Sequence, residues 1–309
     1  PTLALLWYPG AQDAAVLGLR DLLETASRLQ ADRGLPGLEV RVLRTEEGLP
    51  EPEAPFAALV LPPCLGAAPP SDPEGDLKNW LRRRHAEGTL LCSVCAGAFL
   101  LAETGLLDGR SATTHWALKD ALAGAFPAVS VDTDQLLIDL GDLWTAGGLM
   151  AWVDLGLRLV GRFLGPGALQ ATARHFLVDP GGREQRFYAP FAPVLTHGDA
   201  AVLKVQRWLQ AQADAPVGIP AMARRAGLGE RTFLRRFQRA TGLRPTEYVQ
   251  ALRISKAREL LEASDLAVEA VAWEVGYGDA GAFRRIFLRI VGLSPGEYRR
   301  RFSPRYAPP

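Results

Sequence analysis

Residues 231–248 read RTFLRRFQRATGLRPTEY, and residues 281–298 read GAFRRIFLRIVGLSPGEY. At this offset of 50 residues, nine of the eighteen aligned positions are identical, among them two phenylalanines, two arginines and a Gly-Leu pair. The similarity extends upstream, where residues 222–229 parallel residues 271–278. A self-similarity of this kind indicates that one structural unit occurs twice. The last third of the chain is therefore interpreted as two copies of one small unit.

Each copy predicts two helices joined by a tight turn. Gly227 and Gly276 each follow an apolar, Ala-rich segment and suit the turn that ends a helix. A second helix is predicted at 230–240 in one copy and at 280–291 in the other, with a phenylalanine pair spaced i, i+4 on its inner face. The arginines lie off that face. A glycine-containing turn followed by a basic second helix indicates a helix-turn-helix, whose second helix enters the major groove of DNA.

The charge of the chain is unevenly distributed. Residues 216–309 contain 17 Lys and Arg against nine Asp and Glu, a net charge of +8. Because the whole chain carries +1, residues 1–215 carry −7. A basic lobe attached to an acidic one is typical of a nucleic-acid-binding protein, since phosphate contacts require positive charge. The alternative is a helical bundle with a solvated basic face, and the matching arginines of the two copies argue against it.

The repeated stretch resembles the DNA-binding domain of the AraC/XylS family of transcription regulators, in which a long helix joins two helix-turn-helix units. Here that helix is predicted at 246–263, and the resemblance covers residues 199–303. It implies that both recognition helices lie on one face and read successive major grooves, about 34 Å apart in DNA. The expected partner is double-stranded DNA.

Side-chain chemistry then suggests which residues contact the DNA. Arginine binds guanine O6 and N7 through two hydrogen bonds, whereas contacts to phosphate position the protein without reading sequence. We expect base contacts from Arg231, Arg235, Arg284 and Arg285, weaker base contacts from Thr232 and Ala280, a thymine-methyl contact from Leu234, and phosphate contacts from Arg239 and Arg289. A structural DNA protein with little sequence preference is an alternative.

The first part of the chain alternates short apolar runs with helical patterns. This pattern predicts an α/β domain with a doubly wound, mostly parallel sheet, followed by the all-α domain with two helix-turn-helix units. The runs at 57–61 and 90–94 are almost continuously apolar, as expected of strands buried on both faces. Strands are predicted at 3–8, 39–43, 57–61, 89–94, 111–114 and 143–146, and helices at 14–29, 77–84, 97–104, 116–122, 149–164 and 168–176.

Cys95 occupies the point where a buried strand turns into a helix through the small residues of 95–98, Cys-Ala-Gly-Ala. This is the arrangement of a nucleophile elbow, and the dipole of the following helix favours a thiolate. His115 is expected at the end of another strand, from which its imidazole could reach the thiol. Cys95 is interpreted as a catalytic thiol, a sensing or ligand-contacting thiol, or a small residue that the tight turn requires.

Three stretches of this domain, 95–102, 105–110 and 113–116, are similar to the PfpI/ThiJ-like domain of the class I glutamine amidotransferase superfamily. Together with the C-terminal repeat they resemble the GlxA branch of AraC-type regulators, over nearly the whole chain. In PfpI-like enzymes the elbow cysteine is the nucleophile, with a histidine and a glutamate nearby. This chain has no glutamate in the loop at 10–15, and Pro-Pro-Cys at 62–64 replaces a glycine pair. A non-catalytic relative is therefore expected.

A ligand pocket is expected beside the elbow, where the strands of such a sheet end. Its candidate residues are Asp13, Cys64, Cys95, Ala96 and His115, of which only Cys95 and His115 are candidates for catalysis. Cys64 ends a strand and would face the same crevice as Cys95, which suits a sensor of electrophiles or oxidants. We expect a sequence-specific transcription regulator that responds to an unidentified small effector. The alternative is a cysteine hydrolase or amidase that carries a DNA-binding domain.

Other kinds of site are not indicated. Three cysteines give neither a disulfide framework nor the two spaced pairs typical of structural zinc, and no glycine-rich phosphate motif predicts a nucleotide cofactor. No apolar stretch reaches the roughly 20 residues that span a bilayer, so a cytoplasmic protein without membrane contact is expected. The predicted organisation is a sensor domain at 1–188, a linker at 189–198 and a DNA-binding domain at 199–309, in a homodimer formed through the first domain.

Overall fold

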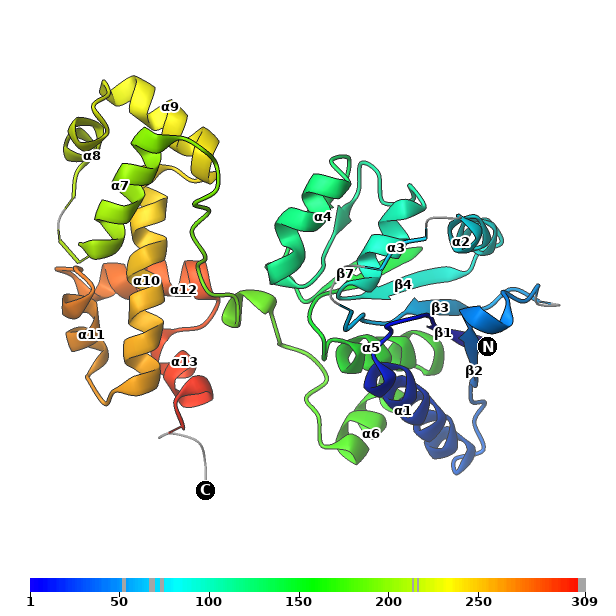
Figure 1. Cartoon of the computed structure of the whole chain (residues 1–309). Helices are drawn as coiled ribbons and strands as arrows, with labels where there is room; N and C mark the ends of the chain where they lie inside the picture. Colours follow the sequence, from blue (N-terminus) through cyan, green and yellow to red (C-terminus); the bar gives the residue numbers. More distant parts are fainter. Residues whose placement is uncertain (52–53, 67–69, 73–74, 213, 216, 305–309) are drawn as a thin grey trace. The chain divides into compact units, whose positions relative to one another are not determined.

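The computed structural model describes residues 1–51, 54–66, 70–72, 75–212, 214–215 and 217–304. The chain divides into two compact units, Pro1–Gln185 and Arg186–Pro309 (Figure 1). The first unit contains a six-stranded sheet and its flanking helices, and the second is helical. These are the two fold classes predicted from the sequence.

The sheet of the first unit has the strand order β2-β1-β3-β4-β8-β7. All neighbouring strands are parallel except β7, which runs antiparallel to β8 at the edge. The central strands are fully buried because helices cover both faces, which explains their apolar sequences. The strands are β1 (Thr2–Trp7), β2 (Glu39–Arg44), β3 (Ala58–Leu61), β4 (Leu90–Val94), β7 (Leu137–Asp139) and β8 (Leu143–Ala146).

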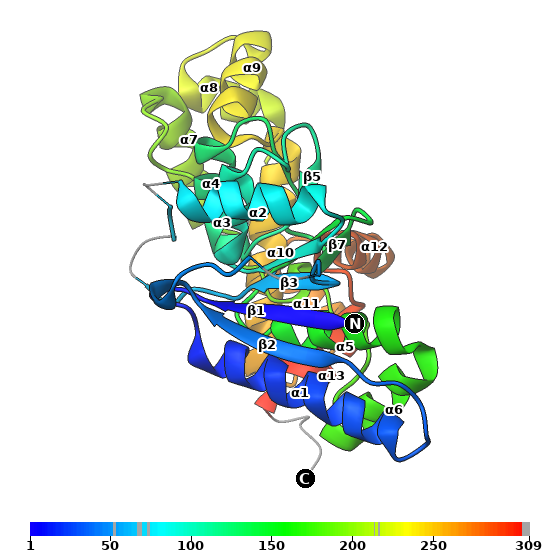
Figure 2. The same ribbon diagram turned by 90° about the vertical axis from the view of Figure 1, so that its right-hand side faces the viewer.

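Helices cover the two faces of this sheet in separate groups (Figure 2). One face is covered by α1 (Asp13–Ala31), α5 (Trp152–Leu164) and α6 (Pro166–Phe176), which contact one another. The other face carries α2 (Asp76–Ala86) and α3 (Gly97–Glu103). The carboxyl ends of β1, β3 and β4 therefore meet at one edge, where the candidate pocket was predicted.

The structure corrects the sequence prediction in the segment after α3. The predicted strand at 111–114 is only the two-residue β5 (Ser111–Ala112), which pairs with β6 (Ser130–Val131) in a separate small sheet. The helix predicted at 116–122 is instead a 3-10 turn, Trp116–Leu118, followed by α4 (Lys119–Ala125). The strands β6 and β7 were not predicted, because they are two and three residues long and lack a clear alternation.

The second unit consists of two helix-turn-helix units around a central helix (Figure 1). One apolar core contains Phe233, Phe237 and Tyr248, and the other contains Phe283, Phe287 and Tyr298. Tyr248 and Tyr298 follow their phenylalanine pairs at the same spacing, so the sequence repeat is also a repeat of packing. The helices are α7 (Ala200–Ala211), α8 (Ile219–Ala226), α9 (Glu230–Thr241), α10 (Pro245–Ala263), α11 (Val268–Glu274), α12 (Ala280–Val291) and α13 (Pro295–Phe302).

Residues 189–198, the predicted linker, contain neither a helix nor a strand in the structure, and they lie along the second unit. The ring of Phe191 meets that of Tyr248 edge to face, with 5.2 Å between the ring centroids. The buried amide of Gln206 donates to the carbonyl of Val194 over 3.0 Å. Separately, none of the described helices is long and apolar enough to cross a membrane.

Asp199 begins α7 as an N-cap. Its carboxylate accepts from the amide of Val202 and from both Nε and Nη2 of Arg236, over 2.8 and 2.7 Å. Arg236, which lies on α9, thereby holds the pKa of this carboxyl below its usual range. The cap thus also ties α7 to the first recognition helix.

We expect Asp199→Ala to lower the free energy of unfolding by about 1–3 kcal/mol at pH 7, because it removes both the cap and a charged hydrogen bond. Asp199→Asn keeps a capping oxygen and loses only the charge. Its free energy of unfolding should therefore lie between those of the wild type and Asp199→Ala. Since the folded pKa of Asp199 is depressed, this stability is present above the ordinary pKa of about 4 and lost as the pH falls through the folded value. Urea unfolding at pH 7 and pH 3 measures both effects. Equal free energies of unfolding for the wild type, Asp199→Ala and Asp199→Asn at pH 7 would show that Asp199 does not stabilise the fold.

Candidate functional sites

The two recognition helices bury one face and expose the other. Phe233 and Phe237 on α9, and Phe283 and Phe287 on α12, are each 0% exposed. Residues spaced i, i+4 share one helical face, so this packing fixes the rotation of each helix about its axis. The arginines between and beside the phenylalanines must then point outward.

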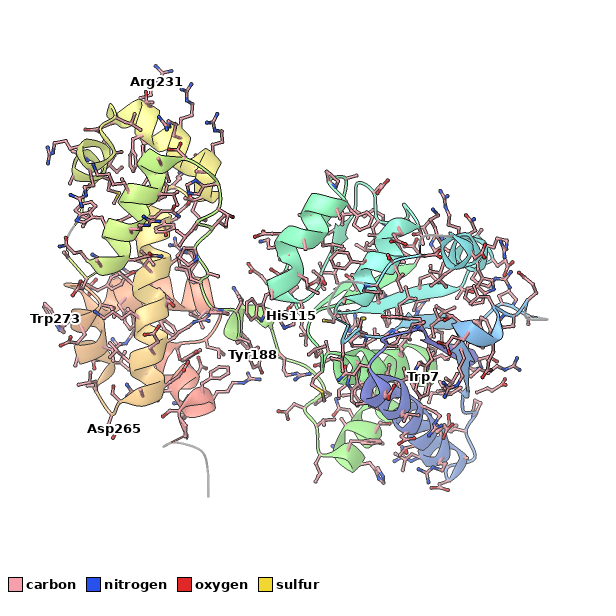
Figure 3. The ribbon with its side chains drawn as sticks, viewed as in Figure 1. Trp7, His115, Tyr188, Arg231, Asp265 and Trp273 are labelled. Carbon is pink, nitrogen blue, oxygen red and sulfur yellow. The ribbon has the colours of Figure 1, made fainter. Side chains whose placement is uncertain are left out.

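On α9 the predicted contact residues form an exposed cationic surface. Arg231, Thr232, Arg235 and Arg239 are exposed, and Leu234 is half-buried. Figure 3 shows the side chain of Arg231 extending away from the helices. Among the residues that the structure describes, none forms a hydrogen bond or an ion pair with the guanidinium of Arg231, Arg235 or Arg239. Three positive charges are therefore available to a phosphate or a base edge.

On α12 the corresponding arginines are exposed but have partners. Arg284 forms an ion pair with Glu269 of α11, and Arg289 Nη2 donates to Gln250 Oε1 over 2.7 Å. Arg285 is also exposed, and Ala280 is half-buried at the first position of the helix. Exposed ion pairs of this kind contribute at most about 1 kcal/mol, so DNA can compete for these arginines.

The predicted elbow is present at Cys95, between β4 and α3. Cys95 has a φ of +54°, in the left-handed region that residues other than glycine seldom adopt. Gly97 permits the sharp bend, since a Cβ there would lie 2.6 Å from the carbonyl oxygen of Leu61 and 2.7 Å from that of Pro62. Ala96 is buried at the N-cap of α3. The strained turn places the sulfur at the carboxyl edge of the sheet.

The thiol of Cys95 is held in its neutral form. Burial raises its pKa to about 11, and the backbone amides of Ala96, Gly148 and His115, which face the sulfur, only partly oppose this effect. The backbone amides favour the thiolate, as expected at the start of a helix, but burial dominates because the side chain is 3% exposed. At pH 7 a pKa of about 11 leaves on the order of one thiolate in ten thousand.

His115 approaches this thiol through its backbone and not through its ring. Its amide faces the sulfur of Cys95, while its Nδ1 accepts from the amide of Ala117 over 3.1 Å. Burial lowers the pKa of the imidazole. Among the described residues, the structure gives no hydrogen bond between the imidazole of His115 and the thiol of Cys95.

The remaining pocket candidates divide into two groups. Cys64 is half-buried and close enough for its charge to raise the pKa of Cys95, so the two thiols lie near each other at this edge of the sheet. Asp13 is exposed at the first position of α1 and has no contact with either thiol among the described residues. The sequence reasoning missed Tyr8, which ends at this edge directly after β1. Its hydroxyl donates to the carbonyl of Pro62, and burial, with Cys64 and Cys95 nearby, raises its pKa.

Comparison with known proteins supports both halves of this description. The model of the DJ-1/PfpI family matches residues 40–161, and that of a helix-turn-helix domain matches residues 222–301. The HTH-type transcriptional regulator GlxA of Rhizobium meliloti is 30% identical over 224 residues, which cover 72% of this chain and 68% of that protein. The chain belongs to this family of HTH-type transcriptional regulators.

Two further relatives are similar to different lengths of the chain. The HTH-type transcriptional regulator GbdR of Pseudomonas aeruginosa is 27% identical over 222 residues, 72% of this chain and 60% of that protein. The isonitrile hydratase of Pseudomonas putida is 29% identical over 174 residues, 53% of this chain and 72% of that enzyme. The chain thus matches about 60 to 68% of the length of GbdR and GlxA. Both resemblances inferred from the sequence are confirmed.

For this member of the family, the environment of the thiols predicts their order of reaction. We expect iodoacetamide to modify Cys64 at least about tenfold faster than Cys95 at pH 7.5, because Cys95 is buried and almost wholly protonated. The rate at Cys95 should rise about tenfold per pH unit up to pH 10, following the thiolate fraction. Mass spectrometry of the folded protein measures each site, and Cys64→Ser isolates Cys95. A rate at Cys95 that levels off below pH 9 would contradict the assigned pKa.

Proposed function

We propose that this protein is a sequence-specific DNA-binding transcription regulator whose helical unit places two recognition helices in successive major grooves of duplex DNA. The observation that carries the proposal is the repeated cationic surface of α9 and α12, which the buried phenylalanine pairs orient outward. In this proposal Arg231, Arg235, Arg284 and Arg285 contact bases, Arg239 and Arg289 contact phosphates, and Thr232, Leu234 and Ala280 make minor contacts.

The geometry of α10 supports simultaneous binding by both helices. Its 19 residues span about 28 Å at 1.5 Å per residue, close to the pitch of about 34 Å that separates successive major grooves. The guanidinium of Arg253 on this helix donates to the carbonyls of Ala215 and Gly276, both over 2.9 Å. It thus links the segment before the first helix-turn-helix to the turn of the second. Fixed spacing lets one chain bind two half-sites.

In the same proposal the first unit regulates DNA binding by binding a small molecule at the crevice of Cys64, Cys95 and Tyr8. Two thiols and a phenol, with backbone amides facing the sulfur of Cys95, suit a small polar or electrophilic effector. Homodimerisation through the first unit is part of the proposal and rests on the likeness to regulators. A cysteine hydrolase is disfavoured, because the thiol is protonated and, among the described residues, no hydrogen bond joins it to the imidazole of His115.

Selection from random duplexes tests the proposal and provides a binding site. We expect enrichment of two short motifs, and we expect Arg235→Ala to weaken binding by about 1–3 kcal/mol and to relax the preference at one base pair. Arg239→Ala should weaken binding to all sequences alike and lower the slope of log K against log salt by about one. Arg82 is an exposed arginine on α2, in the first unit, so Arg82→Ala is the matched control. It should change neither the affinity for DNA nor its salt dependence.

Two results would overturn these assignments. Binding without sequence enrichment would indicate a structural DNA protein. A uniform loss across all sequences in Arg235→Ala would assign that residue to phosphate.

A further inference from the structure

The two helix-turn-helix units differ in charge, although their sequences are related. Residues 219–241, which form α8 and α9, contain six arginines and one glutamate, a net charge of +5. Even without Arg236, which pairs with Asp199, they keep a net charge of +4. Residues 268–291, which form α11 and α12, contain three arginines and three carboxylates, and their net charge is zero. The attraction to phosphate therefore comes mainly from the first helix-turn-helix.

Two of these three carboxylates lie beside the arginines of α12. Glu269 on α11 accepts a hydrogen bond from Nη2 of Arg284, and both side chains are exposed. Asp279 caps α12 by accepting from two backbone amides of its first turn, over 2.8 and 3.0 Å. Those amides, and to a smaller extent the charge of Arg285, hold the pKa of Asp279 below its usual range. The second recognition helix therefore presents its arginines next to negative charge.

The first helix-turn-helix has neither carboxylate. In the aligned copies, Pro220 takes the place of Glu269. Leu234 takes the place of Arg284. The N-cap of α9 is a glycine, whereas that of α12 is an aspartate. The ion pair between α11 and α12 is thus particular to the second copy, so the fold that the two copies share does not require it.

The ion pair leaves Arg284 able to bind a base. A guanidinium carries five N–H donors, and the hydrogen bond to Glu269 uses one N–H of Nη2. One edge with two parallel N–H groups therefore stays available, as contact with guanine O6 and N7 requires. Arg284 is the fifth residue of α12, near the end of a recognition helix from which base edges are contacted.

We propose that Glu269 is a specificity-determining residue of the second helix-turn-helix, which orients Arg284 for one guanine and repels phosphate. This inference rests on the proposed function. A guanidinium that is already held in one orientation loses less freedom when it binds a base in that orientation. The carboxylate also repels nearby phosphates, which weakens binding to DNA of any sequence. Glu269 therefore lowers the affinity for unrelated DNA and raises the discrimination at one base pair.

Binding of the full chain to a set of duplexes tests this role. The set contains the selected site, an unrelated sequence and single base-pair changes in both motifs, and fluorescence anisotropy measures each Kd. Arg284→Ala identifies the base pair that this arginine reads. We expect Glu269→Gln, which keeps the shape and loses the charge, to bind the unrelated duplex about threefold more tightly and to lose about threefold of the preference at that base pair. The preferences in the other motif should not change.

Glu274 provides the matched control, because it is exposed on the same helix and forms no ion pair with Arg284 among the described residues. Glu274→Gln removes an equal charge and should leave every base preference unchanged. In the Arg284→Ala background, Glu269→Gln should alter the preference no further, since the side chain that it orients is absent. Should Glu269→Gln fail to fold, Glu269→Asp keeps the charge on a shorter side chain and should relax the same preference without tighter binding to the unrelated duplex.

The outcomes separate this inference from the proposed function. A base preference that is unchanged in Glu269→Gln overturns the inference and leaves the proposed function intact. An equal loss of preference in both motifs, or the same loss in Glu274→Gln, also overturns it, because the effect would not depend on contact with Arg284. A wild type that enriches no motif overturns the proposed function and this inference together.

Discussion

The hydrogen bonds between two arginines of α10 and distant backbone carbonyls are the constraint on which the second unit depends. Arg253 donates to the carbonyl of Ala215, before the first helix-turn-helix, and to that of Gly276, in the turn of the second. Arg258 donates to the carbonyls of Arg186 and Ala189. Arg258 is only 8% exposed, and burial lowers its pKa. Two backbone carbonyls that accept from its guanidinium help to offset the cost of burying the charge. One helix therefore holds both recognition helices and the segment that arrives from the first unit.

The same helix explains why glycine is needed at one turn in particular. Gly276, which accepts from Arg253, has a φ of +83°, and a Cβ there would lie 2.2 Å from the carbonyl oxygen of Asp214. The second helix-turn-helix thus packs directly on the chain that enters the first one. The cationic surfaces of α9 and α12 therefore have a fixed spacing within the second unit. The repeat in the sequence corresponds to these two helix-turn-helix units.

In the first unit, burial decides the chemistry of the elbow. Backbone amides and a helix N-terminus favour the thiolate of Cys95, and yet removal from water dominates and raises its pKa to about 11. The fold of a cysteine enzyme is retained with a thiol that is protonated at neutral pH and a histidine whose Nδ1 caps its own turn. Such a site suits binding better than hydrolysis, in agreement with a regulatory role.

Much of this could be predicted from local sequence. The i, i+4 phenylalanines and the glycines defined α9 and α12 to within one residue, and nearly continuous apolar runs defined β3 and β4. The failures share one cause, which is contact between residues distant in sequence. The buried amide of Gln185 donates to Thr113 and Thr114, some 70 residues earlier, and Arg236 turns inward only because Asp199 lies there. The burial that neutralises Cys95 likewise comes from packing that no local pattern encodes.

The central claim is that one chain reads two half-sites at a spacing fixed by α10, and base-pair insertion between the selected motifs tests it most directly. With a rigid α10, inserting five base pairs turns the second half-site to the opposite side of the duplex. Affinity should then fall to that of a single half-site. An affinity unchanged by the insertion would contradict the account, because it would mean that the two recognition helices are not held at one spacing.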